Sequence, residues 1–156
     1  MRVAFGSDHA GFTLKEILKG ELALRGHEVS DLGTADADVR VDYPDFGAAV
    51  GRAVAAGAAD VGICTCGSGN GIAMAANKIP GVRAAVVHDV TTASLARRHN
   101  HANVVCLGSR VVGAHVAVDA LIAFLSADEE GGRHSDRIAK LARLDRELVH
   151  NSEGTP

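Results

Sequence analysis

The chain has 156 residues and a formal net charge of -3 at pH 7, and it contains no block of basic residues, which argues against a nucleic acid as its main partner. Hydrophobic residues make up 47% of the sequence, so we expect a single domain over residues 1–150 and a flexible tail at 151–156. No apolar run is long enough to span a membrane, and no signal peptide precedes the first strand. Together with an odd number of cysteines, these features predict a cytoplasmic protein with reduced thiols and no membrane partner.

Short apolar runs alternate with amphipathic segments along the chain. The apolar runs predict five strands, at residues 2–5, 27–32, 61–66, 82–87 and 104–107. Apolar residues at helical spacing predict helices at residues 12–24, 46–56, 72–77, 91–99, 114–125 and 135–149. Gly26 and Gly57 stand where a glycine commonly ends a helix. The alternation predicts an α/β fold, a three-layer α/β/α sandwich on a five-stranded parallel Rossmann-like sheet, plus a C-terminal helix.

Polar residues follow the carboxyl ends of several predicted strands, where parallel sheets bind their ligands. These residues are Asp8, His9, 66–71, His88, Asp89 and 108–110. The Asp8-His9 pair would also suit a helix cap beside a solvent-facing histidine, but its position at a strand end favours a functional role. Because the carboxyl ends of parallel strands share one edge of a sheet, these segments predict a single site.

The segment Cys66-Gly67-Ser68-Gly69-Asn70-Gly71 links the third predicted strand to the third predicted helix. Its three glycines let backbone N–H groups approach a ligand closely, and the start of a helix adds a positive dipole. In such surroundings a cysteine tends toward the thiolate, so Cys66 is predicted to act as a base or nucleophile. The site is therefore expected to hold a negative charge that is bound or that develops during a reaction.

Other interpretations of this loop are weaker. Its glycines lack the G-x-G-x-x-G spacing of a dinucleotide site, although Asp89 could imitate the ribose-binding acid, and no G-K-[ST] follows as in a P-loop. Cys64 and Cys66 lack the second pair of ligands expected of a zinc site. A loop that only makes a tight turn, and a non-catalytic nucleotide- or phosphate-binding module, both stay open at this point.

Basic and imidazole side chains near two helix ends are further candidates. Arg133 and Arg137 are four residues apart, so they share one face of the last helix, with His134 beside them. Guanidinium groups bind phosphate through paired N–H donors, and positive charge at a helix start favours a bound anion. His99 ends the fourth predicted helix and could transfer protons near neutral pH.

Several short motifs, taken together, resemble one known family. They are Gly6-Ser7-Asp8-His9-Ala10-Gly11-Phe12, Asp42-Tyr43-Pro44, the loop at 66–71, Ala75-Ala76-Asn77-Lys78, Arg98-His99-Asn100, Gly108-Ser109-Arg110 and Gly131-Gly132-Arg133-His134. The chain resembles type B ribose-5-phosphate isomerases from residue 2 to about residue 144. That family includes galactose-6-phosphate isomerase and related aldose–ketose phosphate isomerases. The resemblance implies that the chain interconverts D-ribose 5-phosphate and D-ribulose 5-phosphate through a cis-enediol, without a metal or cofactor.

The resemblance also implies roles for individual residues. Cys66 would be the base that moves a proton between C1 and C2 of the sugar, assisted by the Ser68 hydroxyl. Amides of Gly67, Gly69, Asn70 and Gly71, with that of Ser68, would stabilise the enediolate. His99 would be the acid that opens the furanose ring, reaching in from a second subunit, and Asp8 would act on the ring oxygens.

Substrate binding is divided among further residues in this resemblance. The phosphate would be bound by His9, Arg133 and Arg137, with Arg110 nearby. Asn100 would hold the sugar, and Tyr43 would line the site. The resemblance further implies a homodimer, or a dimer of dimers, in which subunits share the active site.

One position departs from part of the family. Some members lack the cysteine and use a glutamate just after the glycine loop, where this chain has Ile72, a side chain that cannot accept a proton. The presence of Cys66 makes the thiol mechanism the consistent one. Because the loop does not distinguish among sugars, a tetrose or hexose phosphate, such as erythrose 4-phosphate, allose 6-phosphate or galactose 6-phosphate, is an alternative substrate.

Overall fold

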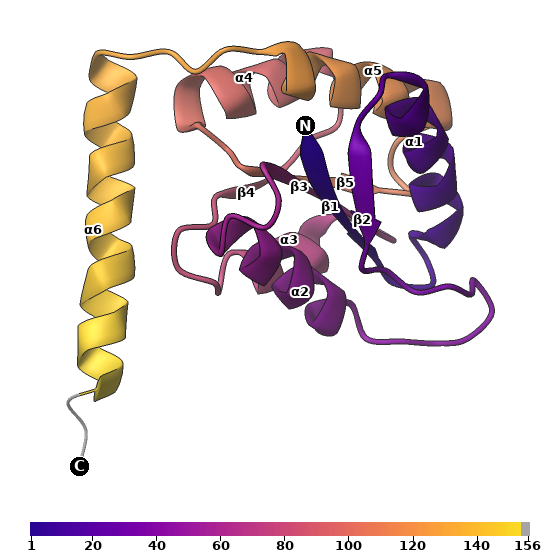
Figure 1. Cartoon of the computed structure of the whole chain (residues 1–156), viewed down its shortest axis with the longest axis horizontal. Coiled ribbons are helices and arrows are strands. Elements are labelled where there is room, and N and C mark those ends of the chain that lie inside the picture. The colour runs from indigo at the N-terminus through magenta and orange to yellow at the C-terminus, as the bar shows by residue number, and fades with distance from the viewer. Residues whose placement is uncertain (154–156) are drawn as a thin grey trace.

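The computed structural model describes residues 1–153, and its centre is a parallel sheet of five strands in the order β2-β1-β3-β5-β4 (Figure 1). The strands are β1 (Arg2–Ser7), β2 (Glu28–Asp31), β3 (Val61–Cys66), β4 (Ala84–Val86) and β5 (Val104–Gly108). β1 pairs with β2 on one side and with β3 on the other. The chain therefore adds β2 on one side of β1 and then reverses direction, adding the remaining strands on the other side. Open α/β sheets bind ligands where the strand order reverses in this way.

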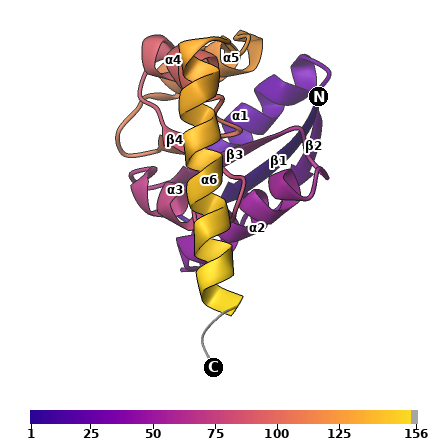
Figure 2. The same ribbon diagram turned by 90° about the vertical axis from the view of Figure 1, so that its left-hand side faces the viewer.

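Helices cover both faces of the sheet, which confirms the predicted three-layer sandwich (Figure 1). One face carries α1 (Phe12–Leu24), α4 (Val90–Asn100) and α5 (Ala114–Ser126), and the other carries α2 (Tyr43–Ala55) and α3 (Asn70–Ala76). The last helix, α6 (Arg133–Glu153), stands beyond the β4 edge of the sheet and apart from both layers in Figure 1, and it runs across the front of the molecule in Figure 2. Across residues 1–153, no helix combines the length and apolar character needed to cross a membrane.

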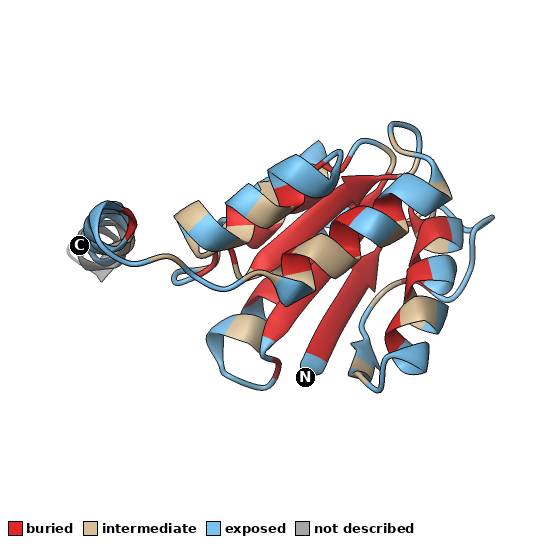
Figure 3. Ribbon diagram, turned by 90° about the horizontal axis from the view of Figure 1, so that it is seen from above, coloured by how far each residue is buried: buried red, intermediate tan, exposed pale blue. Residues whose placement is uncertain are grey.

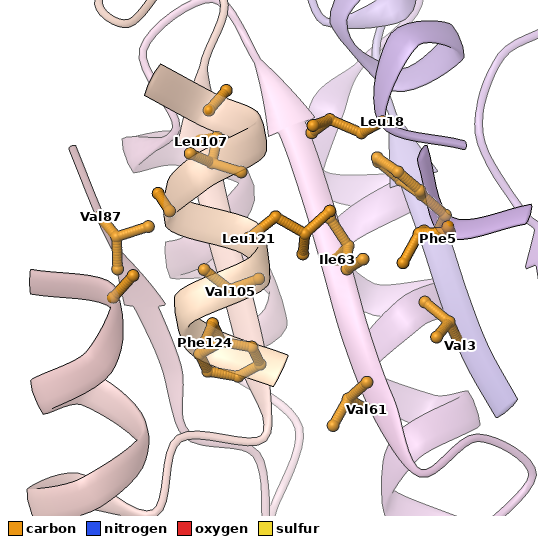
Figure 4. Close-up of a cluster of buried hydrophobic side chains, with 14 of the residues drawn as sticks. Val3, Phe5, Leu18, Val61, Ile63, Val87, Val105, Leu107, Leu121 and Phe124 are labelled. Carbon is orange, nitrogen blue, oxygen red and sulfur yellow. The ribbon is translucent and has the colours of Figure 1, made fainter. Parts of the chain in front are cut away.

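Alternate side chains of each central strand pack into two separate hydrophobic cores, because successive residues of a strand point to opposite faces of the sheet. In β3, Val61 and Ile63 pack with the α1, α4 and α5 side, whereas Cys64 and Cys66 pack with the α2 and α3 side. Figure 4 shows the first core, in which Ile63 lies near Leu121 of α5. The central strands are buried along almost their whole length (Figure 3), so the sheet is a rigid platform for the loops at its ends.

The three cysteines, Cys64, Cys66 and Cys106, are all free thiols buried in the second core. Cys64 lies directly opposite Cys106 in the pairing of β3 with β5. The hydrogen bond with Cys64, together with burial, raises the pKa of the Cys106 thiol. The two thiols further from the strand ends therefore behave as packing groups of the core.

Element boundaries differ from the sequence prediction in places where local chemistry overrides the apolar pattern. The second helix begins at Tyr43 rather than at residue 46, because Pro44 occupies a first-turn position where its missing N–H costs nothing. The fourth strand covers only Ala84–Val86 instead of 82–87. The fourth helix begins at Val90 rather than at residue 91 and is capped by Asp89, with Thr92 completing a reciprocal capping box.

The last helix is longer than the apolar pattern indicates. It begins at Arg133 and extends to Glu153, so residues 151–153, which we expected in the tail, continue the helix. Residues 154–156 lie outside the described residues. Asp145 of α6 accepts a hydrogen bond from the backbone N–H of Gly81 at 2.9 Å, which ties the helix to the turn before β4.

Candidate active site

The loops that follow β1, β3 and β5 meet at the carboxyl edge of the sheet and are joined by hydrogen bonds. The Ser109 hydroxyl donates to the carbonyl of Ala10 at 2.7 Å, and the Ser109 N–H donates to the carbonyl of Cys66 at 2.9 Å. The Arg110 N–H donates to the carbonyl of Gly67 at 3.0 Å. These contacts fix three segments that are far apart in sequence as one rim, as the sequence predicts.

A cleft of about 410 Å³ opens between these loops. Its lining includes eight of the predicted site residues, namely Asp8, His9, Tyr43, Cys66, Gly67, Ser68, Gly71 and Arg110. Ala10 and Val111 complete the lining and were not predicted; each adjoins a predicted residue at a strand end. The cleft therefore gathers the candidate base, an acid and two basic side chains.

Cys66 is the last residue of β3, and it is nearly buried, with 4% of its surface exposed. Its Sγ accepts a hydrogen bond from the backbone N–H of Gly69 at 3.1 Å. Gly69 has a φ of 82°, a left-handed conformation that favours glycine. An N–H directed at sulfur stabilises negative charge that develops there during a reaction.

Asp8 and His9 are held by backbone groups at the end of β1. Asp8 is 6% exposed, and its Oδ1 accepts the Gly11 N–H at 2.9 Å. The residue that caps α1 is Gly11, so Asp8 is not the helix cap that was the alternative interpretation. The Nδ1 of His9 lies 3.3 Å from both the backbone N and O of Val41, which fixes the imidazole ring beside the cleft.

Side chains lie over two of the loop glycines, and at Gly71 the contact is too close for any Cβ. A Cβ at Gly71 would be 2.7 Å from Cζ of Tyr43, and a Cβ at Gly67 would be 3.5 Å from Cζ of Arg110. Gly71 therefore admits the Tyr43 ring, while the Arg110 guanidinium lies against the loop at Gly67. The tyrosine and arginine thus close over the glycine loop.

Of the other three loop residues, one lines the cleft and two do not. Ser68 lines the cleft, and its Oγ accepts the Asn70 N–H at 3.3 Å. Gly69 and Asn70 do not line the cleft: Gly69 is buried beneath the loop, and Asn70 is an exposed residue that begins α3.

A second group of predicted residues lies apart from this cleft within one chain. His99 and Asn100 end α4, whereas Arg133 and Arg137 are exposed on the first turns of α6. A helix that follows a parallel strand runs back along the sheet, so the end of α4 lies at the amino edge, opposite Cys66. The structure therefore divides the predicted site into two sets, one at each edge of the sheet.

The second set also contains Glu130, which was not predicted, and His134, which was named as a candidate beside Arg133 and Arg137. The rings of His99 and His134 stack with centroids 4.2 Å apart, and Glu130 lies beside both. Among residues 1–147, whose side chains the structure describes, this trio is the group whose donor atoms could hold a metal, all within 4.8 Å of one another. The hydrogen bond from Arg98 lowers the pKa of the Glu130 carboxyl, and burial lowers the pKa of the His134 imidazole.

Comparisons with known proteins match this chain in sequence and in fold. A family model described as Ribose/Galactose Isomerase covers residues 3–141. Ribose-5-phosphate isomerase B of Escherichia coli (strain K12) is 45% identical over 144 residues, which cover 92% of this chain and 96% of that protein. The solved Clostridium thermocellum ribose-5-phosphate isomerase B has a TM-score of 0.93 and 45% identity, covering 95% of this chain and 99% of that one.

A third relative was solved with a ligand. The ribose-5-phosphate isomerase B of Mycoplasma genitalium, with bound ribulose-5-phosphate, has a TM-score of 0.90 and 44% identity. The alignment covers 94% of this chain and 97% of that chain. On this evidence, the chain belongs to the ribose/galactose isomerase family.

Proposed function

We propose that this chain interconverts D-ribose 5-phosphate and D-ribulose 5-phosphate. The observation that carries the proposal is the Cys66 thiol, which lines a strand-end cleft with Asp8 and Arg110 and accepts the Gly69 N–H. Relatives that match almost the whole chain bear the name of this activity, and one of them was solved with ribulose-5-phosphate bound.

The isomerisation itself needs one base that moves a proton between neighbouring carbons. The Cys66 thiolate takes the proton from C2 of the open-chain aldose, which leaves an enediolate with its charge on O1. The Ser68 hydroxyl relays the O2 proton to O1. The thiol then returns its proton to C1, and O2 becomes the ketone oxygen. Backbone amides of Gly67, Ser68 and Gly71, the loop residues that line the cleft, stabilise the transient oxyanion.

Ribose 5-phosphate is mainly a furanose, so the ring must open before C2 can lose its proton. In the proposed step, His99 gives a proton to the ring oxygen as the bond from that oxygen to C1 breaks. Asp8 takes the proton of the C1 hydroxyl; its Oδ1 already accepts the Gly11 N–H, which leaves the other carboxylate oxygen for the substrate. Asn100 holds the sugar hydroxyls, and Tyr43 closes the cleft over the loop.

The phosphate is bound by positive side chains at the open end of the cleft. His9 and Arg110 line the cleft beside Cys66. Arg133 and Arg137, four residues apart on α6, supply two more guanidinium groups in the proposal. Paired N–H donors of arginine match the geometry of phosphate oxygens.

The division of the site implies self-association. His99 and Arg133 lie away from Cys66 in one chain, so a complete site requires that a second copy bring its α4 end and α6 start to the cleft. A two-fold dimer would form two such sites, because each chain gives and receives the same surface. A dimer of dimers keeps the same pairing.

The experiment that tests the proposal replaces Cys66 with alanine. Cys66→Ala is expected to abolish turnover of ribose 5-phosphate while calorimetry still detects binding of the sugar phosphate. Cys64→Ala is the matched control, because Cys64 lies two residues earlier on the same face of β3 and is fully buried in the core. Wild-type turnover by Cys66→Ala would overturn the mechanism.

The choice of sugar needs a separate measurement, since the family model names galactose as well as ribose. We expect the highest kcat/KM for ribose 5-phosphate in a panel that also contains erythrose 4-phosphate, allose 6-phosphate and galactose 6-phosphate. A higher kcat/KM for one of the others would assign the chain to that substrate within the same mechanism. Tight binding of ATP or NAD, with no effect of any sugar phosphate, would favour the non-catalytic module.

A further inference from the structure

Glu130 is clamped against the last turn of α4, although it lies more than 25 residues further along the chain. Its backbone N–H donates to the carbonyl of Arg98 at 2.8 Å, and its own carbonyl lies 2.8 Å from Nε2 of His101. Its Oε1 accepts the Nε–H of Arg98 at 2.7 Å. Contacts to the main chain and to one carboxylate oxygen therefore fix where the other oxygen, Oε2, is directed.

That second oxygen faces both stacked imidazoles. Oε2 of Glu130 lies 3.4 Å from Nε2 of His99 and 3.7 Å from Nε2 of His134. The two rings are almost parallel, with 10° between their planes. One carboxylate oxygen thus lies near the Nε2 atom of both rings. Which ring donates a hydrogen bond to it depends on which Nε2 carries a proton.

The hydrogen bond between Arg133 and His134 shows which Nε2 carries a proton. The Nε–H of Arg133 lies 3.3 Å from Nε2 of His134 and donates to it. Because an arginine nitrogen only donates, Nε2 of His134 must be the acceptor and carries no proton. Burial lowers the pKa of His134, and the nearby His99 and Arg133 add to that effect, so this ring is neutral. Of the two rings, only His99 can then donate a hydrogen bond from Nε2 to Glu130.

We propose that Glu130 is a positioning residue for His99: its carboxylate holds the Nε2–H of His99 and leaves Nδ1 as the nitrogen that gives a proton to the substrate. This inference rests on the proposed function, in which His99 opens the sugar ring. After Nδ1 gives up its proton, His99 is left as the neutral tautomer with hydrogen on Nε2, which is the form that Glu130 stabilises. A carboxylate that orients an imidazole in this way is a recurring arrangement in acid–base catalysis.

The surrounding charges show why a carboxylate is needed. Arg98 on α4, and Arg133 and Arg137 on α6, place positive charge near the stacked rings. These cations disfavour a charged His99, and the Glu130 carboxylate offsets them.

The same trio has donor types that suit a metal ion, but its contacts argue for a proton. The Nε2 of His134 already accepts from Arg133, and Oε1 of Glu130 already accepts from Arg98. Parallel stacked rings also direct their ring nitrogens side by side, whereas ligands of one ion must converge on it.

The test uses the full-length protein with Glu130→Gln, which keeps the shape of the side chain and removes its charge. Glu129→Gln is the matched control, because Glu129 contacts Arg97 and His101 from the same linker. Two quantities are measured: the ¹⁵N signals of the His99 ring, assigned with His99→Asn, and kcat/KM for ribose 5-phosphate between pH 6 and 9.

Glu130→Gln is expected to lower the charged fraction of His99 and to move the alkaline limb of kcat/KM to lower pH. An opposite charge at this distance changes the ratio of charged to neutral imidazole by about tenfold. We therefore expect kcat/KM to fall about tenfold at pH 8.5 and to change little at pH 6. A purely structural role would lower activity equally at every pH. Glu129→Gln should keep both the signals and the limb of the wild type.

The outcomes separate this inference from the function on which it rests. Unchanged His99 signals in Glu130→Gln would overturn the inference, whatever His99→Asn does to turnover. A uniform loss at all pH values would overturn it as well. If the His99 signals move in Glu130→Gln but His99→Asn keeps wild-type turnover, the result would instead contradict the proposed role of His99 as the acid.

Discussion

The backbone N–H of Gly69 lies 3.1 Å from Sγ of Cys66, so the loop that leaves β3 turns back onto the last residue of that strand. Gly69 can direct its N–H this way because it adopts a φ of 82°. A Cβ at this position would also lie 3.1 Å from the carbonyl carbon of Leu107. The donor that faces the thiol therefore depends on a residue without a side chain.

The first prediction concerns this donor. Gly69→Ala is expected to cost about 1–2 kcal/mol of unfolding free energy, because L-residues are strained in the left-handed region. It should also lower kcat about 100-fold, as does the loss of one donor that stabilises a developing charge. Steady-state kinetics and urea denaturation measure the two effects.

Gly20→Ala is the control for this substitution. Gly20 lies within α1, and nothing is found within 4 Å of its Cβ position. Alanine there should stabilise the protein slightly and leave kcat unchanged, since it only replaces a poor helix former. If Gly69→Ala turned over at the wild-type rate, the hydrogen bond to sulfur would have no part in the reaction.

The second prediction tests the sharing of the site between subunits. Cys66→Ala and His99→Asn are each expected to be inactive alone. When the two variants are unfolded, mixed and refolded together, half of the dimers should be mixed, and each mixed dimer should contain one intact site. Activity should return to about a quarter of the wild-type value. A mixture that stays inactive would mean that each chain builds its site from its own residues.

The third prediction concerns a half-buried ion pair between Lys15 of α1 and Asp31 at the end of β2. Nζ of Lys15 lies 2.8 Å from Oδ2 of Asp31, and the Lys15 side chain is only 1% exposed. Burial alone would raise the pKa of Asp31, but hydrogen bonds from Lys15 and Lys19 outweigh it and lower that pKa from 3.8. Because the folded-state pKa is lowered, the stabilisation is present above the unfolded value and is lost as the pH falls through the folded one.

Asp31→Asn is therefore expected to lower the unfolding free energy by roughly 2 kcal/mol at pH 7, since it leaves the buried Lys15 charge with only the more distant Glu16 carboxylate, at 3.4 Å. The difference from the wild type should shrink as the pH falls below about 4. Urea denaturation at several pH values measures this, with the exposed Asp128→Asn as the control. A difference that stayed constant down to pH 2 would show that the ionised carboxylate is not the stabilising group.

The fourth prediction concerns the start of α4. The Asp89 side chain accepts the Thr92 N–H at 2.7 Å, which satisfies an unpaired donor of the first turn. That hydrogen bond is also the main reason that the pKa of Asp89 is lowered. Asp89→Ala should cost about 1 kcal/mol in thermal or urea unfolding. Thr91→Ala, which changes a neighbouring exposed hydroxyl, should cost much less; equal losses would contradict the cap.

The sequence predicts the fold well where a pattern is local. The helix at 12–24 has the predicted bounds, because its apolar spacing is regular and Gly26 follows with a φ of 72°. The start of the second helix at Tyr43 is missed because its first turn is polar and contains proline, so no apolar periodicity marks it. The fourth strand is shorter than its apolar run, since only Ala84–Val86 pair with β5.

The candidate site was predictable where it depends on strand ends. Asp8, Cys66 and Arg110 each follow or end a strand of the same parallel sheet, so topology alone brings them together. Glu130 was not predictable, because an acidic linker gives no indication of which helix it will contact. The separation of His99 from Cys66 follows from the return direction of α4, which periodicity does not report.

The burial of the three thiols makes their reactivity very unequal. Cys64 and Cys106 are sealed within the second core, whereas Cys66 forms part of the cleft wall. A small alkylating reagent should therefore label a single sulfur in the native protein and all three after denaturation. Mass spectrometry of the labelled chain would then report how much of a preparation is folded, and sugar phosphate in the cleft should protect the one accessible thiol.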